Sequence, residues 1–416
     1  KVRHWLWVDD GTDTCPTWAT PYEQAATSDP SRAAGPWGRS GDHLYMLYTG
    51  GTTGMPKGVM WRQDDNIRNV IAAGTNPRYR DDPVDYADTA ELVREPGFIS
   101  IPACPLMHGT GCMTQLIVLC GGGCVVTLES TALDIEEMYD TIERVGVTTL
   151  AIVGDAFAKP MLRALDAEPD RWDLSSLVVI ASSGVMFSEA SKQGLIRHLP
   201  QLMIVDAFSS SEAIGMGQSV AAAGLDAGTA KFMVGPNSKV FTEDLKEVAP
   251  GSGEVGRVAV GGNQPIGYYK DPEKTAATFG EVDGQRYSVP GDFATVEADG
   301  SITLLGRGSV CINTGGEKVF PEEVEEILKT HEMVRDAVAV GVPDDKFGEA
   351  VTAVVELAPD VELDESAIIG HVKGKLAAYK APKRVLAVET IGRAPNGKVD
   401  YKRLRTLAKD ELGISD

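Results

Sequence analysis

The sequence lacks the cysteine spacing of a metal centre or a redox site. Its six cysteines stand at positions 15, 104, 112, 120, 124 and 311, with no Cys-x-x-Cys pair and no cluster with histidine. We therefore predict reduced, mostly buried thiols in a cytoplasmic protein. The alternative is a metal-binding pair at Cys120 and Cys124, for which the neighbouring sequence offers no further ligands.

Positive charge and long apolar runs are also scarce. Lysine and arginine number 39 against 60 aspartates and glutamates, which gives a formal net charge of −21. A chain of this charge repels nucleic acid and anionic membranes, so we predict neither as a partner. The most apolar stretch, residues 113–128, is interrupted by Thr114, Gln115 and three glycines, so we predict no transmembrane segment.

The chain does have enough apolar material for a large core. Of its 416 residues, 43% are hydrophobic, which suits two or three domains. The hydrophobic periodicity predicts strands at 124–128, 148–153, 177–181 and 202–205, alternating with helices at 134–145, 154 to about 167, and 188–198. This alternation predicts an α/β protein with a doubly wound, mostly parallel sheet.

After about residue 231 the pattern changes to short strands separated by turn residues, which predicts a β-rich subdomain over 231–305. The stretch 306–309 then resembles a hinge. Predicted helices at 321–330 and 365–376, with predicted strands at 337–342 and 351–357, form a small, mobile α+β domain. We therefore expect a large domain over 1–307 and a small C-terminal domain over 308–416.

Residues 48–58 read Tyr-Thr-Gly-Gly-Thr-Thr-Gly-Met-Pro-Lys-Gly. Glycine-rich turns aim successive backbone N–H groups at one point and so bind an anion, and Lys57 adds a charge suited to phosphate. With apolar runs on both sides, the stretch predicts a loop between two strands that holds the polyphosphate of a nucleotide. The alternative is an ordinary glycine-rich hairpin. The stretch 48–58 is not a Walker P-loop, because Pro56 and Gly58 flank Lys57.

This loop resembles the signature loop of the adenylate-forming superfamily: acyl-CoA synthetases, luciferases and the adenylation domains of peptide synthetases. Further stretches are similar to the motifs of that superfamily, in the same order, at 105–111, 182–185, 206–212, 287–292, 312–325 and 395–398. The resemblance covers about residues 44–400. Because the superfamily carries a further α/β segment before this point, and residues 2–8 look like a strand of a larger sheet, we expect an N-terminal part to be missing.

The resemblance implies a role for each early motif. The implied nucleotide contacts of the glycine-rich loop are Lys57, Thr49, Gly50, Gly51, Thr52, Thr53 and Gly54. His108 would line the acyl site, and Ser183 and Gly184 would pack against adenine. In the motif at 206–212, Asp206 would contact the nucleotide, Phe208 would face adenine, Ser211 would touch the α-phosphate, and Glu212 would hold Mg²⁺. Ser209 stands where the family usually has glycine.

The later motifs imply a ribose site and a moving domain. Asp292 would accept from both ribose hydroxyls and Arg307 would be a second ribose contact. Ser309 occupies the hinge position, which is commonly Asp or Lys in the family. Gly316 would let the pantetheine arm of coenzyme A pass, Lys318 would belong to the second half-reaction, and Lys398 would be catalytic in the first.

We therefore predict an ATP-dependent acid–thiol ligase that uses Mg²⁺ and coenzyme A, and we allow for a homodimer. Residues 48–62, 153–157 and 313–321 look most like actinobacterial fatty-acyl-CoA ligases, some of which activate steroid side-chain acids. The alternatives are an acyl-AMP ligase that loads a carrier protein and a non-catalytic nucleotide-binding regulator.

The residues expected to line the acyl tunnel are small: Ser182, Ser183, Gly184, Ser209, Ala213, Gly215 and Gly217. The larger neighbours are Met107, His108 and Met216. No tryptophan lies between residues 206 and 217 to close the tunnel. We therefore predict a bulky or long apolar carboxylic acid as the substrate.

Overall fold

The computed structural model describes residues 4–9, 11, 13–27, 38–49, 56–72, 93, 95–130, 132–225, 228–394 and 397–414. The chain divides into two compact units, Lys1–His43 and Leu44–Asp416. In the first unit, β1 (Leu6–Trp7) pairs in parallel with β2 (Thr20–Pro21), and the short helix α1 (Tyr22–Ala26) follows. The strand expected at residues 2–8 is thus paired, among the described residues, with this short segment rather than within a larger sheet.

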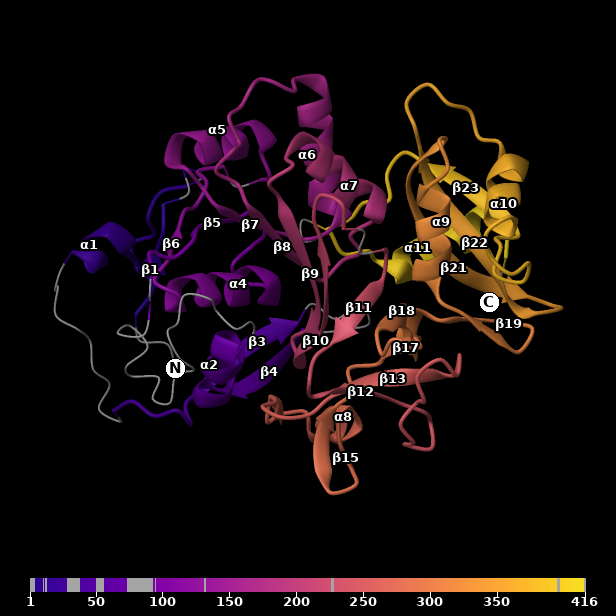
Figure 1. Ribbon diagram of the computed structural model, residues 1–416, viewed down its shortest axis with the longest axis horizontal. Helices are drawn as coiled ribbons and strands as arrows, with labels where there is room; N and C mark the ends of the chain where they lie inside the picture. The colour runs from indigo at the N-terminus through magenta and orange to yellow at the C-terminus, as the bar shows by residue number, and fades with distance from the viewer. Residues whose placement is uncertain are drawn as a thin grey trace. The chain divides into compact units, whose positions relative to one another are not determined.

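The second unit is built around a mixed sheet of thirteen strands among the described residues. Five of them are parallel and neighbour one another in the order β6 (Cys124–Val125), β5 (Ile99–Pro102), β7 (Thr149–Ile152), β8 (Val179–Ser183) and β9 (Met203–Ser210). Figure 1 shows helices α5 (Ile135–Val145) and α6 (Asp155–Ala167) along one side of these strands and α4 (Gly109–Cys120) along the other. The predicted α/β class is confirmed.

Capping residues explain why the predicted helices begin and end where they do. The carboxylate of Asp134 accepts a hydrogen bond from the N–H of Glu137 at 3.1 Å and so caps α5. Gly146 ends the helix with φ +72°, a conformation that costs glycine little. Between these ends Met138, Tyr139 and Ile142 are fully buried, as the helical spacing predicts. Helix α7 (Glu189–His198) is capped in the same way by Ser188.

The sheet is less parallel than we expected. Strand β9 does not stop at residue 205 but continues through the polar motif to Ser210, because alternate residues, Ile204, Asp206 and Phe208, face the interior. The chain turns at Ser211 and Glu212 and returns antiparallel as β10 (Ala213–Ala221). The motif at 206–212 therefore lies mostly inside a strand rather than in a loop after one.

Beyond β10 every further strand of this sheet pairs antiparallel. They are β11 (Lys231–Val234), β12 (Ser238–Phe241), β13 (Val255–Val260), β15 (Phe279–Val282), β16 (Gln285–Ser288), β17 (Asp292–Val296) and β18 (Ile302–Arg307). Because β11 pairs with both β10 and β18, the sheet runs unbroken into the predicted β-rich subdomain. Helix α8 (Pro272–Thr278) was not predicted from the sequence. Asp271 caps it, and proline occupies its first position.

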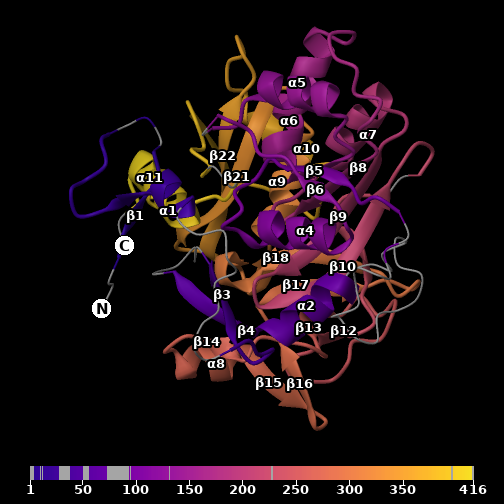
Figure 2. The same ribbon diagram turned by 90° about the vertical axis from the view of Figure 1, so that its left-hand side faces the viewer.

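A second, three-stranded sheet supports the glycine-rich stretch. Strands β3 (Leu44–Thr49) and β4 (Lys57–Arg62) form an antiparallel pair, and β14 (Gly267–Tyr268) pairs with β4. Helix α2 (Gln63–Ala72) follows β4. Both ribbon views show β3 and β4 below α4 (Figures 1 and 2). The predicted strand–loop–strand arrangement is thus present, although the loop between the strands lies outside the described residues.

The C-terminal part contains a five-stranded sheet of β19 (Ile312–Thr314), β20 (Glu317–Val319), β21 (Val334–Asp344), β22 (Gly348–Leu357) and β23 (Arg384–Val388). Its helices are α9 (Pro321–Lys329), α10 (Glu365–Lys373) and α11 (Tyr401–Leu412), and a short 3₁₀ turn (Gly308–Val310) leads into it. Valines of β21 and β22 fill its core from both faces. The division at residue 307 stays a prediction. Among the described residues, no helix is both long and apolar enough to cross a bilayer.

Candidate active site

The two strands around the glycine-rich loop bring its ends together. Thr49 is the last residue of β3 and pairs directly with Lys57, the first residue of β4. Five of the predicted nucleotide contacts, Gly50, Gly51, Thr52, Thr53 and Gly54, lie outside the described residues. The placement of Thr49 and Lys57 is what a hairpin loop around a phosphate chain requires, and their roles stay predictions.

Lys57 and Glu212 both contact the same tyrosine. The Nζ of Lys57 lies 5.6 Å from the ring centroid of Tyr268, within the range of a cation–π contact. The hydroxyl of Tyr268 donates to Oε1 of Glu212 at 2.7 Å. Burial and the charge of Glu212 raise the pKa of Tyr268, so the phenol stays a donor. One aromatic side chain therefore joins the predicted phosphate lysine to the predicted magnesium ligand.

The turn at Ser211 and Glu212 is held by two more donors from distant segments. The indole Nε1 of Trp61, which is fully buried, donates to the carbonyl of Ser211 at 3.0 Å. The hydroxyl of Ser288 donates to the carbonyl of Glu212 at 2.7 Å. Sequence reasoning missed Trp61, Tyr268 and Ser288 as parts of the site. Ser288 lies in the motif at 287–292 and Trp61 in the stretch 48–62, whereas Tyr268 lies in none of the stretches named from the sequence.

Asp292 and Arg307 face each other across neighbouring strands. They pair directly between β17 and β18, and the Nε of Arg307 lies 3.2 Å from Oδ1 of Asp292. The side chain of Asp292 is only 8% exposed, whereas that of Arg307 is 47% exposed. Burial raises the pKa of Asp292, and the charge of Arg307 opposes that rise.

The second carboxylate oxygen of Asp292, Oδ2, is buried and has no hydrogen-bond partner in the described part of the chain. An unsatisfied buried acceptor costs free energy unless a ligand supplies the donor. The hydroxyls of a ribose would supply it. Asp292 and Arg307 therefore fit the ribose contact that the resemblance implies.

Lys398 interacts electrostatically with Arg307 and Glu212. Burial and the charge of Arg307 lower the pKa of Lys398, while Glu212 acts in the opposite direction. Burial, and next the charge of Lys398, lower the pKa of His108. The charge of Lys398 thus interacts with those of the ribose arginine and the predicted magnesium ligand and also acts on the acyl-site histidine, although the four residues come from separate segments.

The small residues expected around adenine are only partly free for a ligand. Gly184 adopts φ +94°, and the nearest atom to a Cβ built on it is the Thr110 hydroxyl at 3.5 Å. That hydroxyl donates to the carbonyl of Ser183 at 3.3 Å. Ser182, by contrast, is buried and accepts from the N–H of Gly154. Ser183 and Gly184 therefore stay the predicted surface against which adenine would pack, and they lie beside the first turn of α4.

Two residues of the motif at 206–212 are occupied by the protein itself. Phe208 is 8% exposed and its ring lies 5.4 Å, between centroids, from that of Phe232. Asp206 forms a 3.0 Å ion pair with Lys192, and the two side chains are 8% and 1% exposed. These contacts give both residues a structural part, and their predicted contacts with the nucleotide are untested.

Gly316 and Lys318 lie on the hairpin of β19 and β20. Gly315 and Gly316 have φ +62° and +87°, as a two-residue turn between these strands requires. Lys318 pairs with Glu243 at 3.3 Å and lies 5.7 Å from the ring centroid of Phe293. Both lysine and glutamate are largely exposed, so this pair contributes little to stability.

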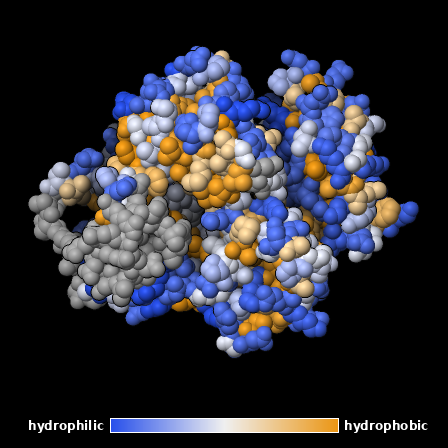
Figure 3. Space-filling model, viewed as in Figure 1, coloured by the Kyte–Doolittle hydropathy of each residue, from blue (hydrophilic) through white to orange (hydrophobic). Residues whose placement is uncertain are grey.

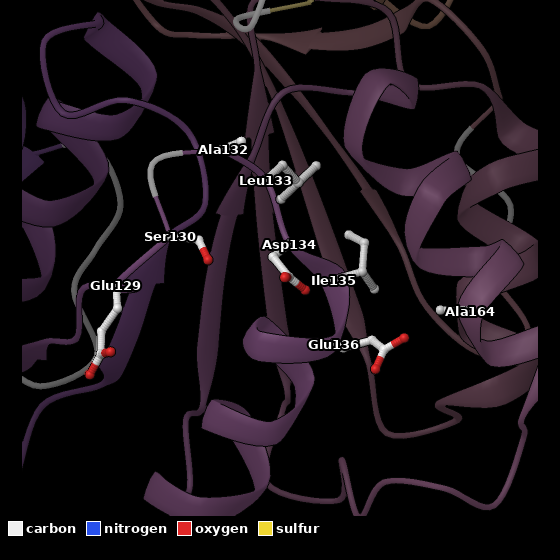
Figure 4. Close-up of a pocket in the computed structure, with 8 residues that line it drawn as sticks. All are labelled: Glu129, Ser130, Ala132, Leu133, Asp134, Ile135, Glu136 and Ala164. Atoms are coloured by element: carbon white, nitrogen blue, oxygen red, sulfur yellow. The ribbon is translucent and has the colours of Figure 1, made fainter. Parts of the chain in front are cut away.

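A surface hollow at the start of α5 is a separate feature, shown in Figure 4. Its polar side chains include Glu129, Asp134 and Glu136. Asp134 caps the helix, and Glu136 forms an ion pair with Arg171 at 2.7 Å. An acidic hollow does not suit an anionic nucleotide, and two of its three named carboxylates already have partners.

Comparison with known proteins agrees with this arrangement. Residues 6–269 match the model of the AMP-binding enzyme family, and residues 323–398 match that of the AMP-binding enzyme C-terminal domain. The chain belongs to the AMP-binding enzyme family. The resemblance to adenylate-forming enzymes, and the prediction of an AMP-forming acid–thiol ligase that uses ATP and coenzyme A, are thereby confirmed.

Relatives of this AMP-binding enzyme include CoA ligases of actinobacteria. It is 41% identical over 396 residues to the medium/long-chain-fatty-acid–CoA/3-oxocholest-4-en-26-oate–CoA ligase of Mycolicibacterium smegmatis, covering 94% of this chain and 71% of the relative. It is 42% identical to the 3-oxocholest-4-en-26-oate–CoA ligase of Rhodococcus rhodochrous, covering 98% and 73%. Among solved structures, ATP-bound MatB from Rhodopseudomonas palustris matches with a TM-score of 0.74 and 25% identity, over 94% of this chain and 72% of that chain.

Proposed function

We propose that this acyl-CoA ligase activates a bulky or long-chain apolar carboxylic acid, with Lys398, Lys57, Glu212 and His108 at the reacting groups. The observation that carries the proposal is the mutual influence of Lys398, Arg307 and Glu212 beside the unpartnered Oδ2 of Asp292. Side chains from both ends of the second unit would then act on one nucleotide.

In the first half-reaction, an oxygen of the substrate carboxylate attacks the α-phosphorus of ATP. The new P–O bond forms as the bond to pyrophosphate breaks, and negative charge builds on the phosphoryl oxygens. Lys57 and Lys398 would stabilise that charge as cations fixed in place beforehand. Asp292 would hold the ribose through its free oxygen, and Arg307 would contact it from the other side.

Magnesium fits the carboxylate of Glu212. Tyr268 donates a hydrogen bond to Oε1 of that group and to no other of its atoms. Among the described residues, no cluster of three or more acidic, His or Cys side chains could hold a metal. Mg²⁺ is commonly bound by one or two carboxylates together with substrate phosphates. When bound, the ion would neutralise the charge of the departing pyrophosphate.

In the second half-reaction, the sulfur of coenzyme A attacks the acyl carbon of the adenylate. A thioester forms, AMP leaves, and the thiol proton passes to solvent. We infer that the C-terminal domain rotates about residues 307–309 between the two steps, so that the face with Gly316 and Lys318 replaces Lys398. Because the two half-reactions would use opposite faces of the C-terminal domain, they would take place one after the other.

The apolar character of the acyl group is supported by the surface near His108. Leu106 and Met107 are 47% and 75% exposed at the start of α4. Figure 3 shows apolar residues gathered in the middle of the face that it presents, between the places of α6 and α4. The names of the relatives, which act on fatty acids and a steroid acid, support the same class. A cytoplasmic location and a homodimer stay predictions of the sequence.

A pyrophosphate-release assay with a panel of acids, with and without coenzyme A, tests the proposal. An acyl-CoA ligase releases pyrophosphate with an apolar acid and turns over repeatedly only when the thiol is present. An acyl-AMP ligase would turn over with a carrier protein but not with coenzyme A. A regulator would bind ATP and release no pyrophosphate with any acid, which would contradict the proposal.

A further inference from the structure

Arg393 fixes the end of the chain segment that carries Lys398. Its Nε and Nη2 donate to the two carboxylate oxygens of Asp336 at 2.7 and 2.9 Å. Its third nitrogen, Nη1, donates to the carbonyl of Gly397 at 3.1 Å. All three guanidinium nitrogens are therefore used, and one of them holds the peptide group that leads directly into Lys398.

Two backbone hydrogen bonds join Ala394 to Gly397 and Lys398. The N–H of Ala394 donates to the carbonyl of Lys398 at 2.9 Å, and the N–H of Gly397 donates to the carbonyl of Ala394 at 2.8 Å. Gly397 adopts φ +75°, and a Cβ built there would lie 3.0 Å from the Cβ of Ala156 on α6. The carbonyls on both sides of the Lys398 Cα thus have fixed donors.

Asp336 is itself held in place. It lies near the start of β21, at a register shift in its pairing with β22, and its Oδ1 also accepts from the N–H of Ala337 at 2.8 Å. The side chains of Asp336 and Arg393 are each 19% exposed. Burial raises the pKa of Asp336, but Arg393, with Lys329 and the N–H of Ala337, lowers it below its ordinary value, so the carboxylate stays charged.

A second anchor holds the chain just after Lys398. The hydroxyl of Tyr401, the first residue of α11, donates to Oε1 of Glu325 at 3.0 Å. The same oxygen of Glu325, on α9, accepts from the N–H of Ala339 on β21 at 3.1 Å. The segment from Arg393 to Tyr401 is therefore tied at both ends to rigid elements of the same domain.

We propose that Arg393, held by Asp336, is a positioning residue for the first half-reaction: it fixes the backbone at Gly397 so that the ammonium group of Lys398 reaches the reacting phosphate. This inference rests on the proposed role of Lys398. Arginine is required here because its planar guanidinium offers parallel donors to a carboxylate and a further donor to a carbonyl. Lysine has one ammonium group and cannot hold both partners in this geometry.

The test measures the two half-reactions separately in Arg393→Ala, Arg393→Lys and Asp336→Asn. ATP–pyrophosphate exchange reports adenylation, and thioester formation from synthetic acyl-adenylate and coenzyme A reports the second step. A misplacement of about 1 Å can cost roughly 100-fold in rate, so we expect kcat of adenylation to fall about 10- to 100-fold in Arg393→Ala. KM for ATP and the second half-reaction should change less than about threefold.

Arg384→Ala is the matched control, because Arg384 also pairs with a carboxylate of this domain, Glu365, at 3.0 Å but lies outside the Lys398 segment. It should leave both half-reactions unchanged. Urea unfolding of each variant shows whether lost activity follows lost stability. Equal losses in both half-reactions of Arg393→Ala, in proportion to its lost stability, would show a merely structural role and overturn the inference.

The double variant Arg393→Ala with Lys398→Ala separates this inference from the proposed function. If Arg393 acts through Lys398, the double variant adenylates no more slowly than Lys398→Ala alone. A further loss in the double variant would mean that Arg393 acts elsewhere. If Lys398→Ala itself keeps full adenylation, the proposed function fails at that residue. If only Lys398→Ala is impaired and Arg393→Ala is not, this inference alone fails.

Discussion

At the scale of single residues, the site depends on donors that no local pattern reveals. The carboxylate of Glu212 is oriented by Tyr268, which lies 56 residues away in the sequence, and the carbonyl before it is held by Trp61, 150 residues away. A hydrogen bond to a charged group contributes about 1.5–3 kcal/mol. Such contacts are formed by the pairing of β4 with β14, which the sequence analysis did not anticipate.

Tyr268→Phe should therefore slow adenylation about 10- to 100-fold while the protein stays folded, because it removes one such hydrogen bond and keeps the ring beside Lys57. The Mg²⁺ concentration for half-maximal pyrophosphate exchange should rise as well. Tyr269→Phe, at the exposed neighbouring position, is the control and should behave like the wild type. An unchanged Mg²⁺ dependence in Tyr268→Phe would show that this hydroxyl does not orient the metal ligand.

Glu322 gives a prediction about pH. Its carboxylate lies against Gly306, and its Oε2 is buried without a partner among the described residues. Burial, and next the charge of Glu325, raise its pKa to about 8. Since an unfolded glutamate titrates near 4.3, the folded protein holds a proton that the unfolded chain has lost between these two values. The free energy of unfolding therefore falls as pH rises from about 4.5 to about 8.

Glu322→Gln removes this titration. We expect the variant to be close to the wild type at pH 5 and to be more stable by on the order of 4 kcal/mol at pH 8.5, in urea unfolding at both pH values. Glu362→Gln, at an exposed position, is the control. A difference between Glu322→Gln and the wild type that is the same at both pH values would contradict the argument.

At the scale of elements, the contact between α7 and β9 contains a buried charge pair. Lys192 of α7 and Asp206 of β9 lie 3.0 Å apart with almost no solvent contact. Removing one partner of such a pair leaves the other charge buried and costs about 3–5 kcal/mol, whereas replacing both with apolar residues costs much less. Lys192→Ala should therefore destabilise strongly, and Lys192→Met with Asp206→Leu should recover most of the loss.

Urea unfolding of these variants checks the prediction. Lys231→Ala is the control, because its pair with Asp299 is at a similar distance, 3.1 Å, but both side chains are about half exposed. Exposed pairs contribute about 0–1 kcal/mol. If Lys192→Ala costs no more than this control, the buried pair does not hold the helix to the strand.

The elements that could be predicted from sequence are those whose signals are local. Helix α5 shows its cap, its apolar spacing and its terminal glycine within thirteen residues of sequence, from Asp134 to Gly146. The end of β9 could not be predicted, because the polar residues that suggested a loop are inward-facing partners of buried groups, as Asp206 is of Lys192. The motifs singled out Asp292, Arg307 and Lys398 as predicted site residues, whereas Arg393 and Tyr268 became visible only through their contacts.

At the scale of the whole molecule, the acyl site should decide which acids the enzyme accepts. Two of the residues expected along the tunnel, the small Ala213 and the larger Met216, face the interior instead, because both are buried in a core cluster with Phe232. Ser183, Gly184 and Ser209 do not belong to this core cluster, so they stay predicted residues of the acyl tunnel. Trp61 does lie near Glu212 in space, but it packs with Val59, Tyr268 and Phe279 in a separate core cluster. Its ring is therefore part of the protein core, and an open tunnel beside Glu212 stays a prediction.

We expect kcat/KM to rise with chain length, because each buried methylene contributes about 0.8 kcal/mol, which is roughly fourfold per carbon. Competition among acetate, octanoate, palmitate and a steroid side-chain acid measures this directly, and acetate should be the poorest substrate. Ser209→Trp would place a large ring in the predicted tunnel and should shift the preference towards short acids, whereas Ser209→Ala keeps the space and should not. A wild-type preference for acetate, or a Ser209→Trp variant that still prefers palmitate, would show that the acyl group lies elsewhere.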